Sequence, residues 1–290
     1  MPFLTERIRF CTRTLIVGLA VVSAFARCAS DPEDIVLPDY QPQPVVECYI
    51  EPGKPMTLLL TQSSPFFAPF DTSRDYLQQA TFIQHALVVV RHGDNLDTLA
   101  NRDYQDPLTR KFYNYHNPKI MEAAPGDPFE LDITLPGGGK IHATAVMPEA
   151  VPFDSIVVQR SPDLNKYARV VAYFRDNPTA NNYYHFLLNY GNLTDSLPRQ
   201  DLVFSDELFQ SEQVAMTSGY DLKKNATAFV TLFHISPEYH AFLESVQLAL
   251  LSSQNPLSQP SPIKSNVHGS ANPIGIFAGL AFDRDTVKVE

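Results

Sequence analysis

The sequence has no tryptophan, three cysteines and a shortage of positive charge. The lack of Trp removes a common stacking platform of sugar-binding surfaces, although 13 Tyr and 19 Phe offer other rings. Lys and Arg number 22 against 32 Asp and Glu, a net charge of -10. Because phosphate binding depends on clustered Lys and Arg, this balance argues against nucleic acid as a partner. The 290 residues, 44% of them hydrophobic, have an ordinary globular composition and are enough for one large or two ordinary domains.

Residues 1–27 have the features of a secretory signal peptide. Arg7, Arg9 and Arg13 precede an uninterrupted apolar run at residues 15–26. A basic start followed by roughly 7–15 apolar residues is typical of a signal peptide, whereas a membrane span needs about 20. We therefore predict export, with a retained N-terminal anchor helix as the alternative.

Cys28 lies where a bacterial lipoprotein is acylated. The acidic segment that follows, residues 29–34, resembles the surface-export tag of Bacteroidota lipoproteins. Arg27 departs from the pattern, because lipoprotein signal peptidase prefers Gly, Ala or Ser there, and Ala24-Phe25-Ala26 is a competing site for ordinary signal peptidase. We predict lipidation at Cys28 and a Pro- and Asp-rich tether over residues 28–44.

Cleavage before Cys28 changes the charge and the thiol content of the chain. It removes four Arg and one Glu, which leaves 18 basic and 31 acidic residues and a net charge of -13. An acidic surface is not attracted to anionic lipid, so membrane attachment is expected through the lipid alone. Acylation of Cys28 leaves Cys48 as the only thiol, which its strand-like setting predicts to be a buried core residue. Cleavage after Ala26 would instead leave Cys28 free to pair with Cys48.

Patterning predicts a mainly β protein with two β-sandwich-like domains, the second with one packed α-helix. The first, residues 45–150, is expected to be an immunoglobulin-like sandwich. Its clearest element is a hairpin in which residues 129–135 and 140–146 alternate apolar and polar side chains around a Pro-Gly-Gly-Gly turn. Other predicted strands are residues 45–50, 56–61 and 86–91.

The Pro-containing segment at residues 147–152 marks the predicted boundary to a second domain, residues 151–290. Within it, Ser236 and Pro237 open a helix that extends to Ser252. In the strand at residues 183–190, alternation places Tyr184 in the core and Tyr183 outward or toward the other domain. The predicted strands are residues 155–159, 168–175, 183–190 and 226–235, and two final strands at 274–282 and 286–290 are expected to close the second sheet.

Four groups of residues carry a resemblance to the domain-of-unknown-function 4249 family, uncharacterised exported lipoproteins of Bacteroidota. They are residues 45–53 (VVECYIEPG), 176–178 (DNP) with 182–184 (NYY), 235–239 (ISPEY), and 255–256 (NP) with 265–267 (SNV) and 275–277 (GIF). No activity is established for that family, so the resemblance supplies no site residues.

The resemblance implies a place in the cell envelope. Such proteins resemble accessories encoded beside TonB-dependent outer-membrane receptors. We therefore expect a lipid-anchored outer-membrane protein, on the cell-surface or periplasmic face, that serves nutrient uptake with such a receptor as partner. The alternative is a structural or adhesive envelope lipoprotein.

Motifs for catalysis, phosphate and metal are missing from the sequence. There is no G-x-S-x-G elbow, no H-E-x-x-H and no phosphate loop, so we predict no enzyme, cofactor or metal site. Residues 94–97 (DNLD) lack the spacing of a calcium loop and are interpreted as a hairpin tip. His234 and His240 flank the helix start, where surface or capping roles are favoured over a metal site.

One aromatic loop is the exception. Phe66, Phe67 and Phe70 lie in a Pro-interrupted segment between strands, and exposed aromatic loops often mark contact sites. We interpret these three residues as a candidate partner-binding loop, against a loop that folds back onto the core.

Overall fold

The computed structural model describes residues 40–64, 81–162, 167–193, 198–208, 212–253 and 261–289. Residues 42–290 form one compact unit. Its described residues are mainly β-strand with one long helix, which confirms the predicted fold class. No helix among them is long and apolar enough to cross a membrane.

The first sheet has nine strands in the order β15-β7-β6-β3-β4-β5-β2-β1-β16. Their bounds are β1 (Pro44–Ile50), β2 (Pro55–Gln62), β3 (Leu87–His92), β4 (Asn95–Gln105), β5 (Phe112–Ile120), β6 (Pro128–Thr134), β7 (Lys140–Val146), β15 (His268–Gly269) and β16 (Ile274–Gly279). The predicted hairpin is β6–β7, and its inward-facing Phe129, Leu131 and Ile133 are buried.

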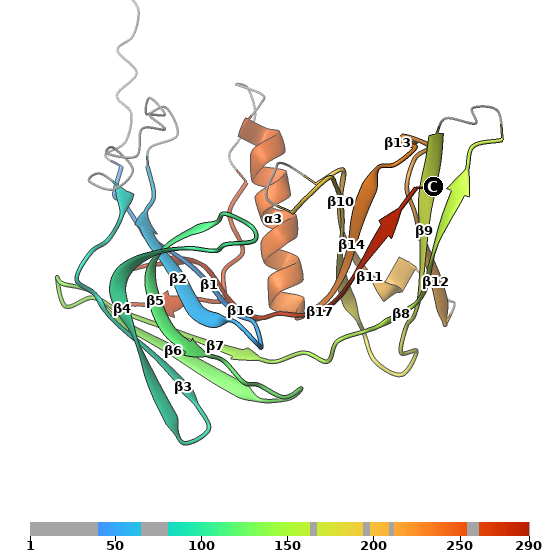
Figure 1. Cartoon of the computed structure of the whole chain (residues 1–290). Coiled ribbons are helices and arrows are strands. Elements are labelled where there is room, and N and C mark those ends of the chain that lie inside the picture. Colours follow the sequence, from blue (N-terminus) through green and yellow to red (C-terminus); the bar gives the residue numbers. More distant parts are fainter. Residues whose placement is uncertain are drawn as a thin grey trace, which may run out of the picture. The chain divides into compact units, whose positions relative to one another are not determined.

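Strand β4 divides this sheet into two halves that face each other (Figure 1). Its first part pairs with β3, as Leu99 does with Val88, and its last part pairs with β5. A single core, which includes Cys48 and Leu131, fills the space between the halves. The arrangement is sandwich-like, but one continuous sheet replaces the two separate sheets of an immunoglobulin-like domain.

Two four-stranded sheets make up a second sandwich. One contains β8 (Phe153–Arg160), β9 (Tyr167–Arg175), β12 (Gln213–Thr217) and β13 (Leu222–Lys223); the other contains β10 (Tyr183–Tyr190), β11 (Gln200–Ser205), β14 (Thr227–Ile235) and β17 (Ala281–Lys288). A short 3-10 helix, η2 (Asp206–Leu208), follows β11. As the alternation predicts, Tyr184, Phe186 and Leu188 of β10 are buried in the core between these sheets.

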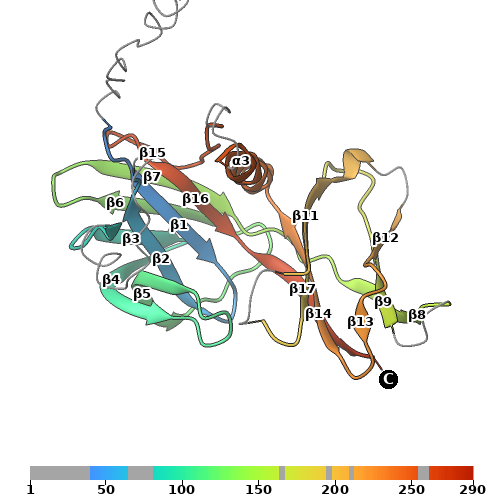
Figure 2. The ribbon, with the colours of Figure 1, turned by 90° about the horizontal axis from the view of Figure 1, so that it is seen from above.

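Helix α3 (Pro237–Ser253) begins as predicted, because the Ser236 hydroxyl accepts a hydrogen bond from the Tyr239 amide at 3.2 Å. Its Tyr239 packs with Ile276 of β16 and with Tyr183, on the outer face of β10. Figure 2 shows the helix nearly end-on between β16 and β11. The helix therefore covers parts of both sandwiches.

The expectation that both final strands close the second sheet is wrong for the first of them. Strands β15 and β16 return to the first sheet, where β16 pairs in parallel with β1, and β17 alone joins the second sandwich. Gly275 permits this pairing, because a Cβ there would lie 1.9 Å from the Val46 carbonyl oxygen. Residues 274–288 thus run from one sandwich into the other with only Leu280 between the two strands.

Candidate functional site

A cavity of about 180 Å³ lies beside the connection between β16 and β17, where the chain passes from one sandwich into the other. Its walls come from the turn between β1 and β2, the hairpin between β4 and β5, and the start of β17. Five aromatic rings and five charged side chains line it, so it combines flat apolar surfaces with fixed charges. The aromatic residues are Tyr49, Tyr104, Tyr113, Phe233 and Phe282; the charged residues are Glu51, Lys54, Asp106, Lys111 and Arg284.

The β1–β2 turn positions Glu51 and Lys54. Gly53 has a φ of 81°, a conformation that glycine adopts without strain, and its amide donates to the Met121 carbonyl at 2.8 Å. The Lys54 ammonium lies 2.9 Å from Glu51 and 3.6 Å from the Asp106 carboxylate. Lys54 is therefore held between two carboxylates.

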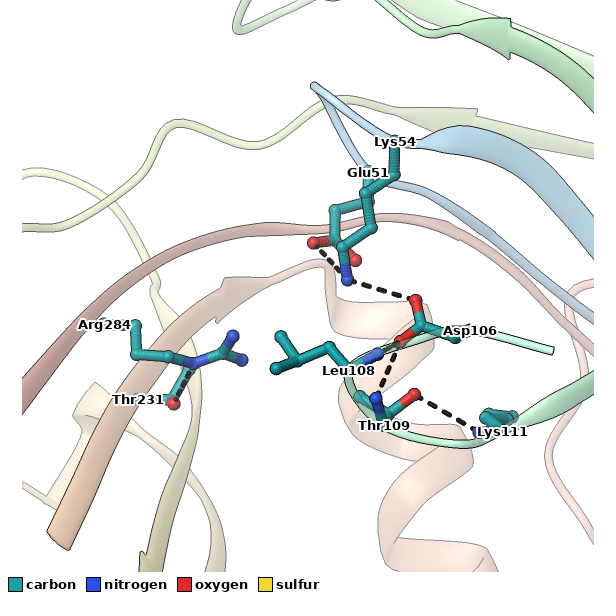
Figure 3. Close-up of polar contacts among 8 residues, drawn as sticks. All are labelled: Glu51, Lys54, Asp106, Leu108, Thr109, Lys111, Thr231 and Arg284. Carbon is teal, nitrogen blue, oxygen red and sulfur yellow. Dashed lines mark hydrogen bonds and ion pairs between the residues drawn. The ribbon is translucent and has the colours of Figure 1, made fainter. Parts of the chain in front are cut away.

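Asp106 organises the β4–β5 hairpin (Figure 3). Its Oδ1 accepts hydrogen bonds from the amides of Leu108 at 2.9 Å and Thr109 at 2.7 Å, while Oδ2 faces Lys54. Burial tends to raise the pKa of Asp106, but the amide bonds and Lys54 outweigh it and hold that pKa below its usual value. Asp106 is consequently an ionised structural anchor at neutral pH.

Lys111 completes the same wall. Its ammonium forms an ion pair with Glu47 and lies 5.0 Å from the Tyr49 ring centroid and 5.7 Å from that of Tyr113. Burial, reinforced by the charge of Glu47, raises the pKa of both tyrosines. Both rings therefore present neutral hydroxyl groups.

Arg284 enters the cavity from the opposite side. It stands across the β14–β17 pair from Thr231, and its Nε donates to the Thr231 hydroxyl at 2.8 Å. The guanidinium carbon lies 4.7 Å from the Phe282 ring centroid. Figure 3 shows the guanidinium directed away from Thr231, toward the β4–β5 hairpin.

Arg284 differs from the two lysines in having no carboxylate within 4.0 Å among the described residues. Burial lowers the pKa of its guanidinium, although the charges of Glu51 and Asp106 act in the opposite direction. Arg284 is therefore a partly desolvated cation with open donor groups.

The sequence-predicted site residues lie elsewhere. Cys28, Phe66, Phe67 and Phe70 are all outside the described residues, so their proposed roles stay predictions. Cys48 is buried, as expected, and forms no disulfide with another described residue.

His234 and His240 contact other residues of the fold, and the DNLD segment belongs to the β3–β4 hairpin. The His234 Nδ1 lies 2.7 Å from the Glu149 carbonyl oxygen, and His240 lies 3.5 Å from Glu244 on the next helical turn. Asp94 lies in the β3–β4 turn beside Gly93, which has a φ of 54°, and residues 95–97 begin β4. In the part of the chain that the structure describes, no three His, Cys, Asp or Glu residues are grouped as metal ligands.

Comparison with known protein families settles the affiliation of the chain. The model of the domain of unknown function DUF4249 matches residues 30–286. The chain belongs to the DUF4249 family. No curated protein matches its sequence.

The central group of residues that carries the family resemblance, 176–178 with 182–184, closes a loop of the fold. Asn182 of the NYY motif donates to the carbonyls of Asn177 at 2.8 Å and Ala180 at 3.0 Å, and to the Asp176 carboxylate at 3.1 Å. Tyr184 donates to the same Asp176 carboxylate at 2.6 Å. This motif therefore fixes the segment between β9 and β10.

Residues 265–267 and 275–277, which also carry the family resemblance, are joined by hydrogen bonds. The Asn266 side chain donates to the Phe277 carbonyl at 2.7 Å and accepts from the Phe277 amide at 2.9 Å, as a neighbouring strand would. The Ser265 hydroxyl accepts from the Gly275 amide at 3.1 Å. These residues hold β16 in the first sheet.

Of the family motifs, VVECYIEPG contributes directly to the cavity, through Tyr49 and Glu51. Sequence reasoning missed Lys54, Asp106 and Arg284 as site residues, since they come from three distant segments. The sequence Asp106-Pro107 does carry a turn signal that predicts the hairpin but not its role.

Proposed function

We propose that this DUF4249 protein is a non-enzymatic, lipid-anchored component of the outer membrane that binds a nutrient for a TonB-dependent receptor. The signal-peptide features, Cys28 and the acidic tether support export and anchoring. The family resemblance supports the receptor as partner. The binding role rests on the cavity beside the connection between β16 and β17. Aromatic residues line this cavity, and the Arg284 guanidinium in it has hydrogen-bond donors to spare.

The charges in the cavity favour binding over turnover. General acid–base catalysis works best with a group whose pKa lies near the operating pH. Here the pKa of Asp106 is lowered, and those of Tyr104 and Tyr113 are raised, so each moves away from neutrality. Among the described residues that line the cavity there is no histidine. The site thus offers fixed charges and donors, which suit recognition.

Anchoring is tested by membrane fractionation of wild type and a Cys28→Ala variant. We expect wild type in the outer-membrane fraction, released only by detergent, and the variant either uncleaved or released to the aqueous fraction. Release of mature wild type into the aqueous fraction would overturn the anchoring part of the proposal.

The receptor role is tested by a mild-detergent pull-down of the mature protein from its native membranes, followed by mass spectrometry. We expect a barrel receptor in stoichiometric amount. Recovery of a surface polymer or its secretion proteins would instead support the structural or adhesive role, and recovery of the protein alone would contradict the receptor partnership.

Turnover is tested by incubating the pure protein with candidate nutrients. We expect each compound to be recovered unchanged, whereas conversion that a single substitution abolishes would contradict the non-enzymatic role.

A further inference from the structure

We propose that the cavity binds a small monocarboxylate with a planar, apolar body, and that Arg284 receives the carboxylate. This inference rests on the proposed binding function and names its ligand class. It is carried by the position of Arg284, the pairing of the other charges, and the size and lining of the cavity.

Arg284 is the open anion-binding group of the cavity. Lys54 is neutralised by Glu51 and Asp106, and Lys111 by Glu47, so neither ammonium is free for a ligand. The guanidinium of Arg284 uses Nε for Thr231 and has no carboxylate within ion-pair distance in the described parts of the chain. Its outer edge can therefore form the two parallel hydrogen bonds that a carboxylate accepts.

The Arg284 side chain is held in place before any ligand arrives. Thr231 is fully buried in β14, and the guanidinium lies over the Phe282 ring. Holding a charged fork in one orientation lowers the entropic cost of binding. Partial burial also strengthens its interaction with an anion, because less water competes.

Neighbouring charges select a monoanion. The carboxylates of Glu51 and Asp106 act on Arg284 from across the cavity. Their repulsion of an anion offsets part of its attraction to Arg284, and a doubly charged phosphate also costs more to remove from water than a singly charged carboxylate. A planar carboxylate also suits Arg284, because the guanidinium can bind both carboxylate oxygens at once, which the compact ammonium of a lysine cannot.

The rest of the ligand is expected to be one flat ring or a group of that size. An apolar cavity of about 150 Å³ can hold benzene, and this one measures about 180 Å³. The rings of Tyr49, Tyr104 and Tyr113 from the first sheet and of Phe282 from β17 line its walls. Aromatic walls favour a planar apolar body.

Isothermal titration of the full mature protein with benzoate tests the proposal. We expect saturable one-to-one binding at millimolar concentrations or below, with benzamide and inorganic phosphate each weaker by at least about tenfold. Benzamide lacks the charge for the fork, and phosphate lacks the apolar body and carries a second negative charge. Arg284→Gln should weaken benzoate binding by at least about tenfold. The matched control Arg175→Gln, at an exposed arginine that pairs with Asp154 on β8, should leave binding within about twofold.

Circular dichroism and thermal melting establish that each variant is folded. If Arg284→Gln fails to fold, Arg284→Lys carries the test, since it keeps the charge and loses the fork; we expect it to weaken benzoate binding several-fold. Absence of saturable benzoate binding, equal binding of benzamide, or unchanged binding in a folded Arg284 variant would overturn the proposal. The receptor pull-down does not depend on benzoate, so a receptor recovered alongside any of these results would leave the proposed function standing.

Discussion

At the scale of single residues, Gly275 decides whether the end of the chain can enter the first sheet. Its φ of 136° and the 1.9 Å between an added Cβ and the Val46 carbonyl oxygen leave no room for a side chain. We expect Gly275→Ala to lower the free energy of unfolding by at least about 3 kcal/mol. Gly137→Ala, in a turn where an added Cβ meets nothing within 4 Å, should change it by less than about 0.5 kcal/mol. Urea unfolding of both variants makes the comparison, and equal effects would contradict this role of Gly275.

Cys48 is expected to be inert in the native protein. It is fully buried, and burial raises the pKa of its thiol, with the charge of Glu47 adding to the effect. A colorimetric thiol reagent should therefore detect no native thiol in the mature protein. It should detect one thiol after denaturation if Cys28 is acylated as proposed. Rapid native labelling would contradict the burial of Cys48, and two thiols in denaturant would contradict the acylation.

Asp106 should make stability depend on acid pH. Its folded-state pKa is lowered, so it contributes stability above its unfolded pKa of about 4, and this contribution is lost as the pH falls through the folded value. We expect Asp106→Asn to be less stable than wild type at pH 7, with the difference shrinking below about pH 4. Denaturant unfolding across this range measures it, with Asp94→Asn at the exposed β3–β4 turn as the control. A difference independent of pH would show that the Asp106 charge is not the cause.

At the scale of elements, local patterns predicted the β6–β7 hairpin and helix α3 because each is specified by nearby residues. Strand β4 was missed because it is polar along most of its length, with Leu99 as its buried residue. Strand β16 was assigned to the wrong sheet because its partner β1 lies more than 200 residues away, and periodicity carries no information about such pairing. The cavity was missed for the same reason, since its walls meet only after these long-range pairings form.

Asn266 acts as a clamp on β16, because its side chain hydrogen-bonds to both backbone groups of Phe277. Its side chain makes both hydrogen bonds that a strand would make with Phe277, so Asn266→Ala leaves a backbone donor and acceptor of β16 without partners. We expect a loss of about 1–3 kcal/mol in unfolding free energy. Asn181→Ala, at an exposed position before β10, should be nearly neutral. Hydrogen exchange should also be faster along β16 in the Asn266 variant alone, and unchanged exchange there would contradict the clamp.

At the scale of the whole molecule, the run from β16 into β17 connects fold and function. It joins the two sandwiches, and it brings Arg284 to the turn and hairpin of the first sheet. The residues that hold β16, Ser265 and Asn266, therefore also help to position the wall of the cavity. Composition could argue against a nucleic-acid partner, but a single sequence without a catalytic motif could not reveal a site assembled from three separate segments.

The most direct test of the central claim is native mass spectrometry of the wild-type protein and its Arg284→Gln variant, each solubilised from the membranes of its own cells. We predict that the wild type carries N-terminal lipid, co-purifies with a barrel receptor and holds one small carboxylate that is released chemically unchanged. The variant should keep the lipid and the receptor but lack the small molecule. A wild-type complex without that added mass, or an equal mass on the variant, would contradict the account.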